Sequence, residues 1–362
     1  MKIGFIGLGL IGGSIARAVR HFYPDAEILA FSRTRASVEQ AVRDGVVSRI
    51  PEGIGADFCD CDYLFLCAPV ACNAEYLKQL KPLICPSCII TDVGSTKSDI
   101  HARVAELDME ANFIGGHPMA GSEKTGYANS KRILIENAYY VITPTSKVPE
   151  EAVERYRDFV ASLKALPLVL DCRTHDYVTA GISHLPHIIA SSLVNLIKDS
   201  DTEDGIMKLV AAGGFKDITR IASSSPEMWE QVCMANRENI SSILNDYIQS
   251  LTRIRQYLDD ARSGAVYQLF ESSRDYRNSL PAKGSGPIQR IYEIYCDMVD
   301  EAGGIATLAT ILASNQINLK NIGIVHSREF IEAVLRIEFY DEPSMKQATD
   351  ILRKYRYVIY ER

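Results

Sequence analysis

One histidine and one serine follow neighbouring predicted strands and could do acid–base chemistry. His117 comes two positions after a predicted strand at 112–115, and Ser95 comes two positions after a predicted strand at 89–93. Histidine is suited to accept the proton of an alcohol while hydride leaves the carbon that bears the hydroxyl. A loop histidine whose nitrogens are satisfied by structural hydrogen bonds is the alternative interpretation. The position next to Pro118 and several glycines makes His117 a candidate general base.

A second group of polar residues lies farther along the chain. His184 and His187 are three residues apart, a spacing that can place both on one face of a helix. Such a pair could suggest a metal site, but no Cys, Asp or Glu stands at a supporting spacing, and we expect no metal. Lys216 and Arg220 follow two glycines, and a guanidinium can hold a carboxylate through two hydrogen bonds. An ion pair between Arg220 and Asp217 is the alternative.

A glycine-rich turn joins a predicted strand at 2–6 to a helix, with the sequence Gly7-Leu8-Gly9-Leu10-Ile11-Gly12. In this context Gly7 permits the tight turn, Gly9 lets the backbone approach a pyrophosphate, and Gly12 lets the helix pack on the strand. The helix N-terminus then faces the phosphates with unpaired N–H groups. The turn therefore predicts a dinucleotide site, with a glycine turn that binds nothing as the alternative.

The type of dinucleotide depends on the segment Ser32-Arg33-Thr34-Arg35, where an Asp or Glu commonly binds the ribose hydroxyls. A carboxylate would repel a 2′-phosphate, whereas Ser32 and Arg33 could hold one. The segment therefore favours NADP. Alternatively, the two arginines only begin a solvated helix.

The elements that must position these residues begin with short apolar runs that alternate with helical patterns. The runs are 2–6, 27–31, 63–67, 89–93, 112–115, 139–143 and 166–170. Such alternation predicts an α/β Rossmann-type doubly wound domain, with a parallel sheet covered by helices on both faces. Ligands of such sheets meet the carboxyl ends of the strands, where His117, Ser95 and the glycine turn are expected.

An all-helical second domain is predicted from residue 172, and we expect it to bind substrate and to dimerise. Apolar residues recur from Ile240 to Leu258 at spacings of four and three on one helix, a seam that could pack inside the chain or between subunits. The uncharged stretch Tyr177–Ile197 is long enough to span a bilayer, but its Ser, His and Asn side chains favour a buried core helix. We expect no membrane contact.

The last part of the chain predicts a third, smaller domain. Residues 279–287 are rich in Pro, Gly and Ser and read as a linker. The order of elements after it is βαββαβ, typical of a ferredoxin-like sandwich. We therefore predict a dinucleotide-binding domain at 1–171, a helical domain at 172–278, a linker at 279–290 and a C-terminal module at 291–362.

Composition limits the partners and the compartment. The chain has 362 residues, 47% of them apolar, which excludes a disordered protein. A net charge of −7 argues against non-specific nucleic-acid binding. The negative net charge does not exclude a local pocket for a small anionic ligand. The cations that we single out for such a pocket are Arg33, Arg35, Lys97 and Arg220. A strand that begins by residue 3 leaves no room for a signal peptide, and nine cysteines without framework spacing suit the cytoplasm.

Taken together, these motifs resemble the prephenate dehydrogenase family of tyrosine biosynthesis. The segments that carry the resemblance are Gly7–Ser14, Asp92–Lys97, Gly115–Gly121 with Ser122-Glu123-Lys124, Ser183–His187, and Gly213–Arg220 followed by Met228-Trp229. The match runs in order from residue 1 to about residue 275. The tail after residue 290 resembles the amino-acid-binding ACT module that some members carry.

The resemblance implies an oxidative decarboxylation of prephenate to 4-hydroxyphenylpyruvate by a homodimer, with hydride passing to NAD, the usual coenzyme of the family, or to NADP. It implies His117 as the base, Ser95 as a bridge between the substrate hydroxyl and the nicotinamide, and Arg220 on a carboxylate. The other implied substrate contacts are His184, His187, Lys216 and Ser122. Together with the glycine turn and the segment after the second predicted strand, we expect these coenzyme contacts: Gly7, Leu8, Gly9, Leu10, Ile11, Gly12, Ser32, Arg33, Ala68, Pro69 and Ser95. The pair Ser32 and Arg33 departs from the family pattern.

The ACT resemblance implies feedback control by tyrosine, bound near the turn at 300–304. A module that only dimerises is the alternative. An arogenate dehydrogenase is a close alternative for the activity, because arogenate carries an amine in place of the ketone. A β-hydroxyacid dehydrogenase would not explain the segment that follows His117. A non-catalytic sensor of a dinucleotide and an amino acid is the alternative from another class.

Overall fold

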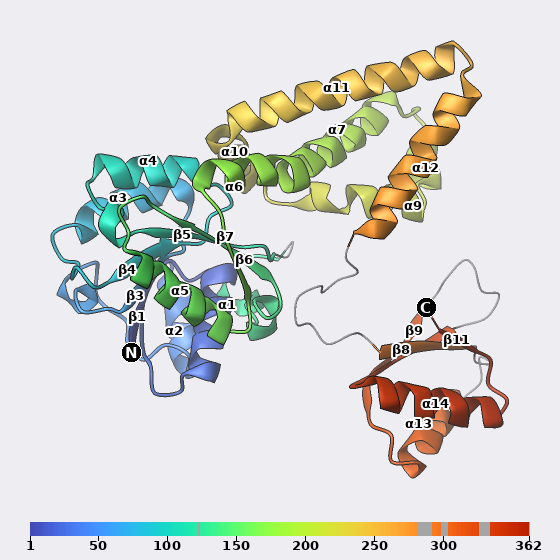
Figure 1. Cartoon of the computed structure of the whole chain (residues 1–362), viewed down its shortest axis with the longest axis horizontal. Coiled ribbons are helices and arrows are strands. Elements are labelled where there is room, and N and C mark those ends of the chain that lie inside the picture. Colours follow the sequence, from blue (N-terminus) through green and yellow to red (C-terminus); the bar gives the residue numbers. More distant parts are fainter. Residues whose placement is uncertain (122–123, 281–291, 298–302, 326–333, 362) are drawn as a thin grey trace. The chain divides into compact units, whose positions relative to one another are not determined.

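The computed structural model describes residues 1–121, 124–280, 292–297, 303–325 and 334–361. The chain divides into two compact units, Met1–Arg274 and Asp275–Arg362, called the N-terminal and C-terminal units below (Figure 1). Two clusters of buried apolar side chains form the core of the N-terminal unit, and a third forms the core of the C-terminal unit. Each unit therefore has a core of its own.

Four parallel strands form the first sheet, in the order β2-β1-β3-β4. They are β1 (Lys2–Ile6), β2 (Glu27–Phe31), β3 (Tyr63–Leu66) and β4 (Ile89–Asp92). Every residue of β3 and β4 is buried, as expected for parallel strands with helices on both faces. The alternating helices are α1 (Leu10–Phe22), α2 (Arg35–Arg43), α3 (Val70–Leu80) and α4 (Ser98–Glu106). The predicted Rossmann-type arrangement is confirmed for this sheet.

A three-stranded sheet continues from the edge of the first, in the order β5-β6-β7. Its strands are β5 (Ile114–Pro118), β6 (Tyr139–Pro144) and β7 (Leu166–Val169). Strand β6 is parallel to β7 but antiparallel to β5, so the prediction of an all-parallel sheet is wrong here. The described part of the connection from β5 to β6 holds only two single helical turns, Tyr127–Asn129 and Arg132–Leu134, rather than the crossover helix that joins parallel strands.

His117 belongs to β5 and lies opposite Val141 of β6, so its predicted position in a loop after the strand is also wrong. The apolar run stops at 115, but backbone pairing continues through Gly116 to Pro118. Periodicity could not reveal this, because glycine, histidine and proline carry no strand signal. The strand therefore holds the His117 backbone rigidly on both sides.

Helix α5 (Glu150–Ser162) joins β6 to β7 and fills the space beneath both sheets with aromatic rings. Its Phe159 stacks on Tyr63 of β3 at a centroid distance of 4.3 Å. The hydroxyl of Tyr156 lies 2.9 Å from that of Thr91 and 3.0 Å from that of Tyr140. Single helical turns at Ala56–Phe58 and Glu110–Asn112 complete the surrounding loops.

A helical layer follows β7, as the sequence predicts. Helix α6 (Cys172–Thr179) passes through a π-helical turn (Ala180–His184) into α7 (Leu185–Ser200). Asp171 caps α6, because its side chain accepts hydrogen bonds from two backbone N–H groups of the first turn. Pro186 has no N–H to donate to the preceding turn, which is one reason for a widened turn at this point. The turn is where His184 lies.

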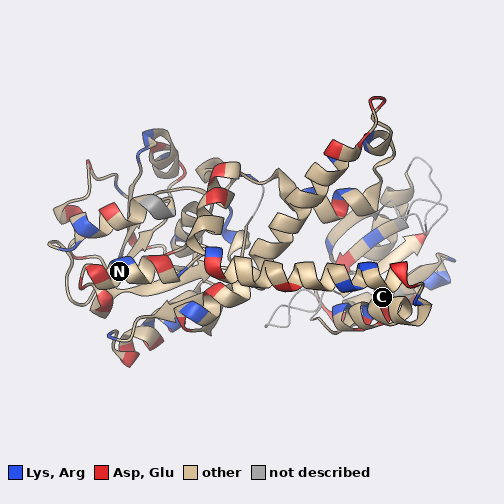
Figure 2. Ribbon diagram, turned by 90° about the horizontal axis from the view of Figure 1, so that it is seen from above, with Lys and Arg blue, Asp and Glu red and all other residues tan. Residues whose placement is uncertain are grey.

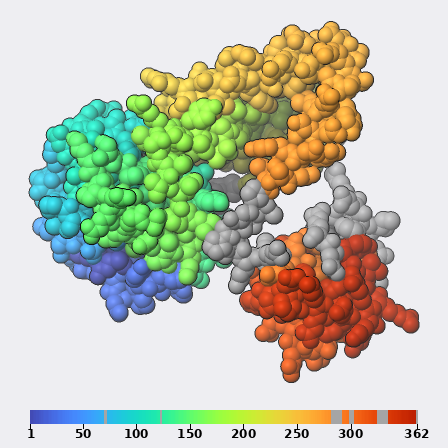
Figure 3. Space-filling view, in the orientation of Figure 1, coloured from blue at the N-terminus to red at the C-terminus, as the bar shows by residue number. Residues whose placement is uncertain are grey.

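The rest of the layer follows α7 along the chain. It comprises α8 (Ile206–Val210), α9 (Gly213–Thr219), a single turn at Arg220–Ser223, α10 (Pro226–Ala235), α11 (Arg237–Asp259) and α12 (Ser263–Ser279). The long helix α11 contacts α7, and the space-filling view shows it along one side of this layer (Figure 3). Acidic and basic residues are interspersed along the helices in the ribbon view (Figure 2).

The apolar faces of this layer are largely open within the chain. The continuous helix Cys172–Ser200 is long and apolar enough to cross a membrane by length and composition, and 22% of its most apolar window is buried. The prediction of a buried core helix is therefore wrong for most of its length. The seam on α11 is buried at Ile240, but Leu251 and Leu258 are exposed. The seam is thus only partly covered by the chain's own helices, which favours the subunit-interface interpretation.

The C-terminal unit has the predicted order of elements. It comprises β8 (Tyr292–Asp297), α13 (Gly304–Ser314), β9 (Leu319–Val325), β10 (Val334–Phe339), α14 (Glu342–Lys354) and β11 (Ile359–Glu361). The strands form an antiparallel sheet in the order β11-β8-β10-β9. Its core is formed by the sheet and the two helices. Most of the predicted linker and most of the turn at 300–304 lie outside the described residues.

Candidate active site

The candidate chemical groups gather at one edge of the sheets of the N-terminal unit. Strands β1, β3 and β4 are parallel, and a parallel bridge between Ile90 and Phe113 gives β5 the same direction as β4. The glycine turn follows β1, Ser95 lies in the bend after β4, and His117 lies near the end of β5. The carboxyl ends of these strands therefore bring the three together, where such sheets bind ligands.

The glycine turn has the shape that a dinucleotide requires. Gly7 has a φ of +88°, and a Cβ there would lie 2.7 Å from the backbone nitrogen of Ala68. A Cβ at Gly12 would lie 2.9 Å from the Cβ of Cys67, so this glycine lets α1 approach β3. Apart from its chain neighbours, no atom of the described residues lies within 4 Å of the position that a Cβ of Gly9 would take. Gly9 precedes α1, which has no side-chain cap and no acidic residue in its first turn. The N–H groups at this helix end are therefore open to a phosphate.

The other predicted coenzyme residues frame the same turn. Leu8 is buried, Leu10 and Ile11 form the first turn of α1, and Ala68 and Pro69 follow β3. Ser32 and Arg33 follow β2 and precede α2. Arg35 belongs to α2, where its Nε lies 3.1 Å from Glu39, so its charge is paired on its own helix. Arg33, which is exposed, is the better candidate of the two for a 2′-phosphate.

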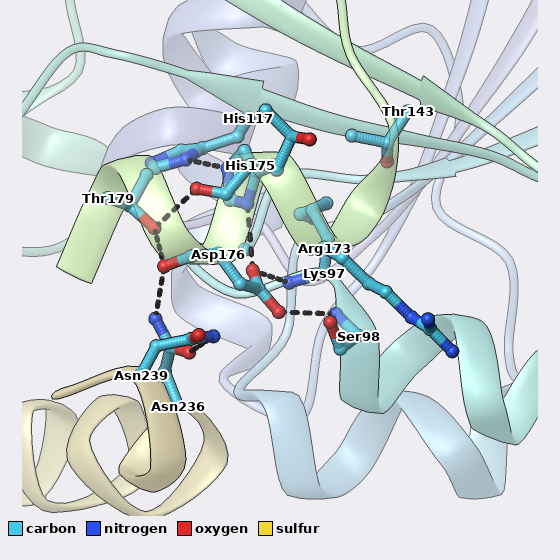
Figure 4. A network of polar contacts seen from close by, with 12 residues as sticks. Lys97, Ser98, His117, Thr143, Arg173, His175, Asp176, Thr179, Asn236 and Asn239 are labelled. Atoms are coloured by element: carbon cyan, nitrogen blue, oxygen red, sulfur yellow. Dashed lines mark hydrogen bonds and ion pairs between the residues drawn. The ribbon is translucent and has the colours of Figure 1, made fainter. Parts of the chain in front are cut away.

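His117 lies in a chain of polar contacts that the sequence did not reveal (Figure 4). Its Nδ1 is 2.8 Å from Nε2 of His175, and Nδ1 of His175 is 2.8 Å from Oδ1 of Asp176. Burial, together with the nearby His175 and Lys97, holds the pKa of His117 well below its usual range. The imidazole of His117 is therefore neutral at pH 7 and able to accept a proton.

Asp176 ties this chain to the start of α4. Its Oδ1 accepts the N–H of Lys97 and its Oδ2 accepts the N–H of Ser98, each at 2.7 Å. Burial alone would raise the pKa of Asp176, but its hydrogen bonds from His175, Ser98 and Lys97 outweigh that and lower it. His175 and Asp176 are adjacent in α6, the helix that follows β7, and this adjacency is the only signal of the pair in the sequence.

Lys97 has a different role from the one predicted, because it is buried and cannot meet a ligand anion. Its ammonium forms an ion pair with Asp92 and donates to the carbonyl of Gly116 at 2.8 Å. Asp92 also accepts the N–H groups of Gly94 at 2.9 Å and Gly116 at 3.3 Å. The sequence places Lys97 in a loop but does not show that its side chain reaches the backbone of β5. We call His117, His175, Asp176, Lys97 and Asp92 the strand-end network.

The predicted histidine pair lies against one tryptophan. The ring of His187 stacks on Trp229 at a centroid distance of 3.7 Å, and the ring of His184 meets it edge-on at 5.9 Å. His184 Nδ1 lies 3.2 Å from Nδ2 of Asn236, which also donates to the carbonyl of Asp176 at 2.7 Å. Asn236 thus connects the histidine pair to the strand-end network.

Two ring nitrogens of this cluster have no partner in the described part of the protein. His184 Nε2 and Trp229 Nε1 are buried without a hydrogen bond, as is the hydroxyl of Thr96. Because Asn236 donates to Nδ1 of His184, the other nitrogen carries the proton. Burial lowers the pKa of His184 to about 4, so the ring is a neutral donor at pH 7. Buried donors of this kind are costly unless a ligand accepts from them.

The predicted cations of the helical layer are exposed. Lys216 lies on α9 and Arg220 in the single turn after it, and both elements contact α7. We call Lys216 and Arg220 the helical cations. Ser122, predicted to contact substrate, lies outside the described residues. Among the described residues, no group of three His, Cys, Asp or Glu side chains could hold a metal ion.

Comparison with protein families assigns both parts of the N-terminal unit. Residues 15–168 match a family described as prephenate dehydrogenase, nucleotide-binding domain. Residues 171–272 match a family described as prephenate dehydrogenase, dimerization domain.

Individual relatives agree with these matches. A prephenate dehydrogenase of Bacillus subtilis is 36% identical over 94% of this chain and 93% of its own length. The crystal structure of a prephenate dehydrogenase from A. aeolicus, in complex with hydroxyphenyl propionate and NAD+, is 27% identical. It has a TM-score of 0.74, with 78% of this chain and 98% of that chain covered. A Synechocystis arogenate dehydrogenase is 28% identical, with a TM-score of 0.69, and 78% of this chain and 100% of that chain are covered.

Proposed function

The chain belongs to the prephenate dehydrogenase family, and we propose that it converts prephenate to 4-hydroxyphenylpyruvate and CO₂ with NAD(P)+ as oxidant. The observation that carries the proposal is the buried, neutral His117 at the strand edge that also bears the glycine turn. A base next to a dinucleotide site is what hydride transfer from an alcohol requires.

His117 is the base for the 4-hydroxyl of prephenate. The hydroxyl proton passes to the imidazole as hydride leaves C4, which turns the alcohol into a carbonyl. Loss of the ring carboxylate as CO₂ then gives the phenolate, and His117 returns the proton to its oxygen. Aromatisation drives the reaction. Ser95, in the bend after β4, is proposed to hydrogen-bond the same hydroxyl. NAD(P)+, when bound, supplies the hydride acceptor.

The helical layer recognises the rest of the dianionic substrate. Arg220 is proposed to hold a carboxylate, with Lys216 adding positive charge. His187 is proposed to face the keto-acid side chain, and the N–H groups of His184 and Trp229 provide donors that the protein does not use. Prephenate has two carboxylates and one ketone, so cations and neutral donors are both required. We keep Ser122 as a proposed contact from the sequence alone.

The residues Gly7, Leu8, Gly9, Leu10, Ile11 and Gly12 are proposed to hold the pyrophosphate, with Ala68, Pro69 and Ser95 along the rest of the coenzyme. The open side of Gly9 and the uncapped start of α1 fit this group. The A. aeolicus relative is described with NAD+. Ser32 and the exposed Arg33 favour NADP, because neither repels a 2′-phosphate. The chain therefore uses NAD(P), and we propose NADP as the better substrate.

The experiment that tests this function is a grid of initial rates. Prephenate and arogenate are each offered with NAD and NADP, with and without tyrosine. We expect reduced coenzyme from prephenate, and no reduced coenzyme with either substrate would contradict the proposal. That outcome would instead support the alternative of a non-catalytic sensor that binds a dinucleotide and an amino acid.

Arogenate is the second candidate substrate. The observation that favours it is the similarity to a Synechocystis arogenate dehydrogenase, at 28% identity. The two substrates differ only where an amine replaces the ketone, a position proposed to lie near His187. The ratio of kcat/KM for the two substrates decides between them, and we expect the ratio to favour prephenate.

The helical layer is proposed to dimerise with a second copy. The support is the family match to a dimerization domain over the residues whose apolar faces are open, including Leu251 and Leu258 on α11. Exposed apolar surface of this kind is typical of subunit interfaces. Light scattering of the full chain is expected to give twice the monomer mass, and a monomer at micromolar concentration would contradict the proposal.

The C-terminal unit is proposed to be an ACT module that binds tyrosine and inhibits the enzyme. The support is its βαββαβ order with the sheet order β11-β8-β10-β9. We keep the domain boundaries 1–171, 172–278, 279–290 and 291–362 as proposals with it. A cytoplasmic location is supported by nine free cysteines. In the rate grid, tyrosine is expected to lower the rate, and an unchanged rate would leave the module a dimerisation element.

A further inference from the structure

His175 is a buried imidazole that directly contacts the proposed base, and the family matches assign it no role. Its Nε2 lies 2.8 Å from Nδ1 of His117. Neither nitrogen faces solvent, because His175 is fully buried and His117 is nearly so. One of the two nitrogens must therefore carry the proton and the other must accept it.

The direction of that hydrogen bond is set by Asp176. Nδ1 of His175 lies 2.8 Å from Oδ1 of Asp176, and an ionised carboxylate can only accept. Nδ1 of His175 therefore carries a proton, and a neutral His175 has its lone pair on Nε2. His117 must then donate from Nδ1, which leaves Nε2 of His117 unprotonated. A doubly protonated His175 would reverse the bond and remove that lone pair.

Hydrogen bonds from neighbouring residues hold Asp176 and His175 in this arrangement. Asp176 is held by the N–H groups of Lys97 and Ser98 at 2.7 Å, so its carboxylate cannot rotate away from His175. The carbonyl of His175 accepts the hydroxyl of Thr179 at 3.0 Å, within the same helix. The charged or titratable groups facing the pair are Asp176, Lys97 and His184.

We propose that His175 is a positioning residue that holds His117 in the tautomer with a free Nε2 and accepts its Nδ1 hydrogen bond during the reaction. When His117 takes the substrate proton, its Nδ1–H continues to donate to His175, which in turn donates to Asp176. The positive charge on His117 is thus opposed by a carboxylate two hydrogen bonds away. The proposal rests on the proposed function in taking His117 as the base.

Three substitutions in the full chain separate positioning from simple structural support. In His175→Gln the side-chain amide can reach the place of Nε2, so an acceptor for His117 remains. In His175→Asn the amide reaches only the place of Nδ1, which keeps the contact with Asp176 but loses the one with His117. His101→Gln is the control, because His101 is a half-buried histidine of α4 that hydrogen-bonds Thr143 at 3.0 Å and has no hydrogen bond to His117.

We expect His175→Asn to lower kcat for prephenate by about tenfold to a hundredfold with KM changed less than threefold, as for groups that orient a reacting residue. We expect His175→Gln to recover kcat to within about fivefold of the parent, and His101→Gln to leave it within about twofold. Equal losses in the Gln and Asn variants would overturn the proposal, because a merely structural role treats them alike. So would an unchanged kcat in His175→Asn.

A second readout does not depend on the reaction. Nitrogen-15 NMR of the full chain with labelled histidine distinguishes protonated from unprotonated ring nitrogens. We expect a protonated Nδ1 and an unprotonated Nε2 on His117 at pH 7, and a loss of this preference in His175→Asn. A protonated Nε2 on His117 in the parent would overturn the inference even if the enzyme is active. The expected tautomer in a chain that does not oxidise prephenate would refute the function alone.

Discussion

The strand-end network and the helical cations are proposed to act on the same substrate, but the network is buried and the cations are exposed. His117 is buried and held by His175, Asp176 and the strand β5. Arg220 lies exposed in a single helical turn of a layer whose apolar faces are open. The chemical step needs a base with one fixed tautomer, which burial provides. Binding a carboxylate needs only charge and reach, which an exposed arginine provides.

The largest expected effect comes from breaking the buried ion pair of the strand-end network. Lys97→Met would leave the carboxylate of Asp92 buried without its cation, and removing one partner of such a pair costs about 3–5 kcal/mol. Guanidinium unfolding of the full chain measures this loss. The control is Lys78→Met, because Lys78 pairs with Glu75 at an exposed site, where the expected change is below about 1 kcal/mol. Similar small losses in both variants would show that the network does not need the pair.

Removing a helical cation is expected to affect binding rather than stability. Arg220→Ala should raise KM for prephenate by about tenfold to a hundredfold, the effect of losing a charged hydrogen bond. Steady-state kinetics with saturating coenzyme measures it. Lys208→Ala, an exposed lysine of α8, is the control and should leave KM unchanged. An unchanged KM in Arg220→Ala would remove Arg220 from the substrate site.

Lowering the pH is expected to destabilise the folded chain through His184, which Asn236 connects to the strand-end network, before it neutralises Asp176 in that network. Burial lowers the pKa of His184 to about 4 in the folded chain, against about 6.5 when unfolded. The unfolded state therefore binds a proton more readily in this window, and stability falls as the pH decreases from about 6.5 to about 4. Asp176, whose pKa is lowered, keeps its charge there. Melting temperatures across this range measure the decline, and His184→Leu should make it shallower; an equal decline in that variant would show that other groups cause it.

The smallest expected effect lies at the end of β2, where both candidate cations are exposed. Arg33→Ala should lower the ratio of kcat/KM for NADP over NAD by about tenfold, the loss of one charged contact. Arg35→Ala should change the ratio less, because Arg35 is paired with Glu39. A ratio that stays constant in Arg33→Ala would assign the preference to other residues.

Much of this organisation could be predicted from local patterns. The strands β1 to β4, the glycine turn and the βαββαβ order follow from apolar runs and turn residues, whose signals are local. His117, His184 and His187 could be found because each stands in a short motif with a chemical reason for its spacing. These strands, turns and motifs depend on residues that are close together in the sequence.

The parts that could not be predicted depend on residues far apart in the sequence. The sequence predicts that Lys97 meets a ligand anion, but in the structure its ammonium pairs with Asp92 and donates to the carbonyl of Gly116. His175 reaches His117 across 58 positions of the chain, so no spacing rule connects them. The burial of α7 was overestimated, because an apolar sequence does not tell whether its own chain or a second copy covers it.

The most direct test of the central claim is the effect of His117→Asn on kcat and on coenzyme affinity, measured on the same preparation. Asparagine keeps a polar side chain in β5 but cannot accept the substrate proton. We expect kcat with prephenate to fall by about 10² to 10⁴-fold, the usual worth of a general base, while the Kd for NADP changes less than threefold. A kcat within tenfold of the parent, with coenzyme affinity intact, would show that His117 is not the base.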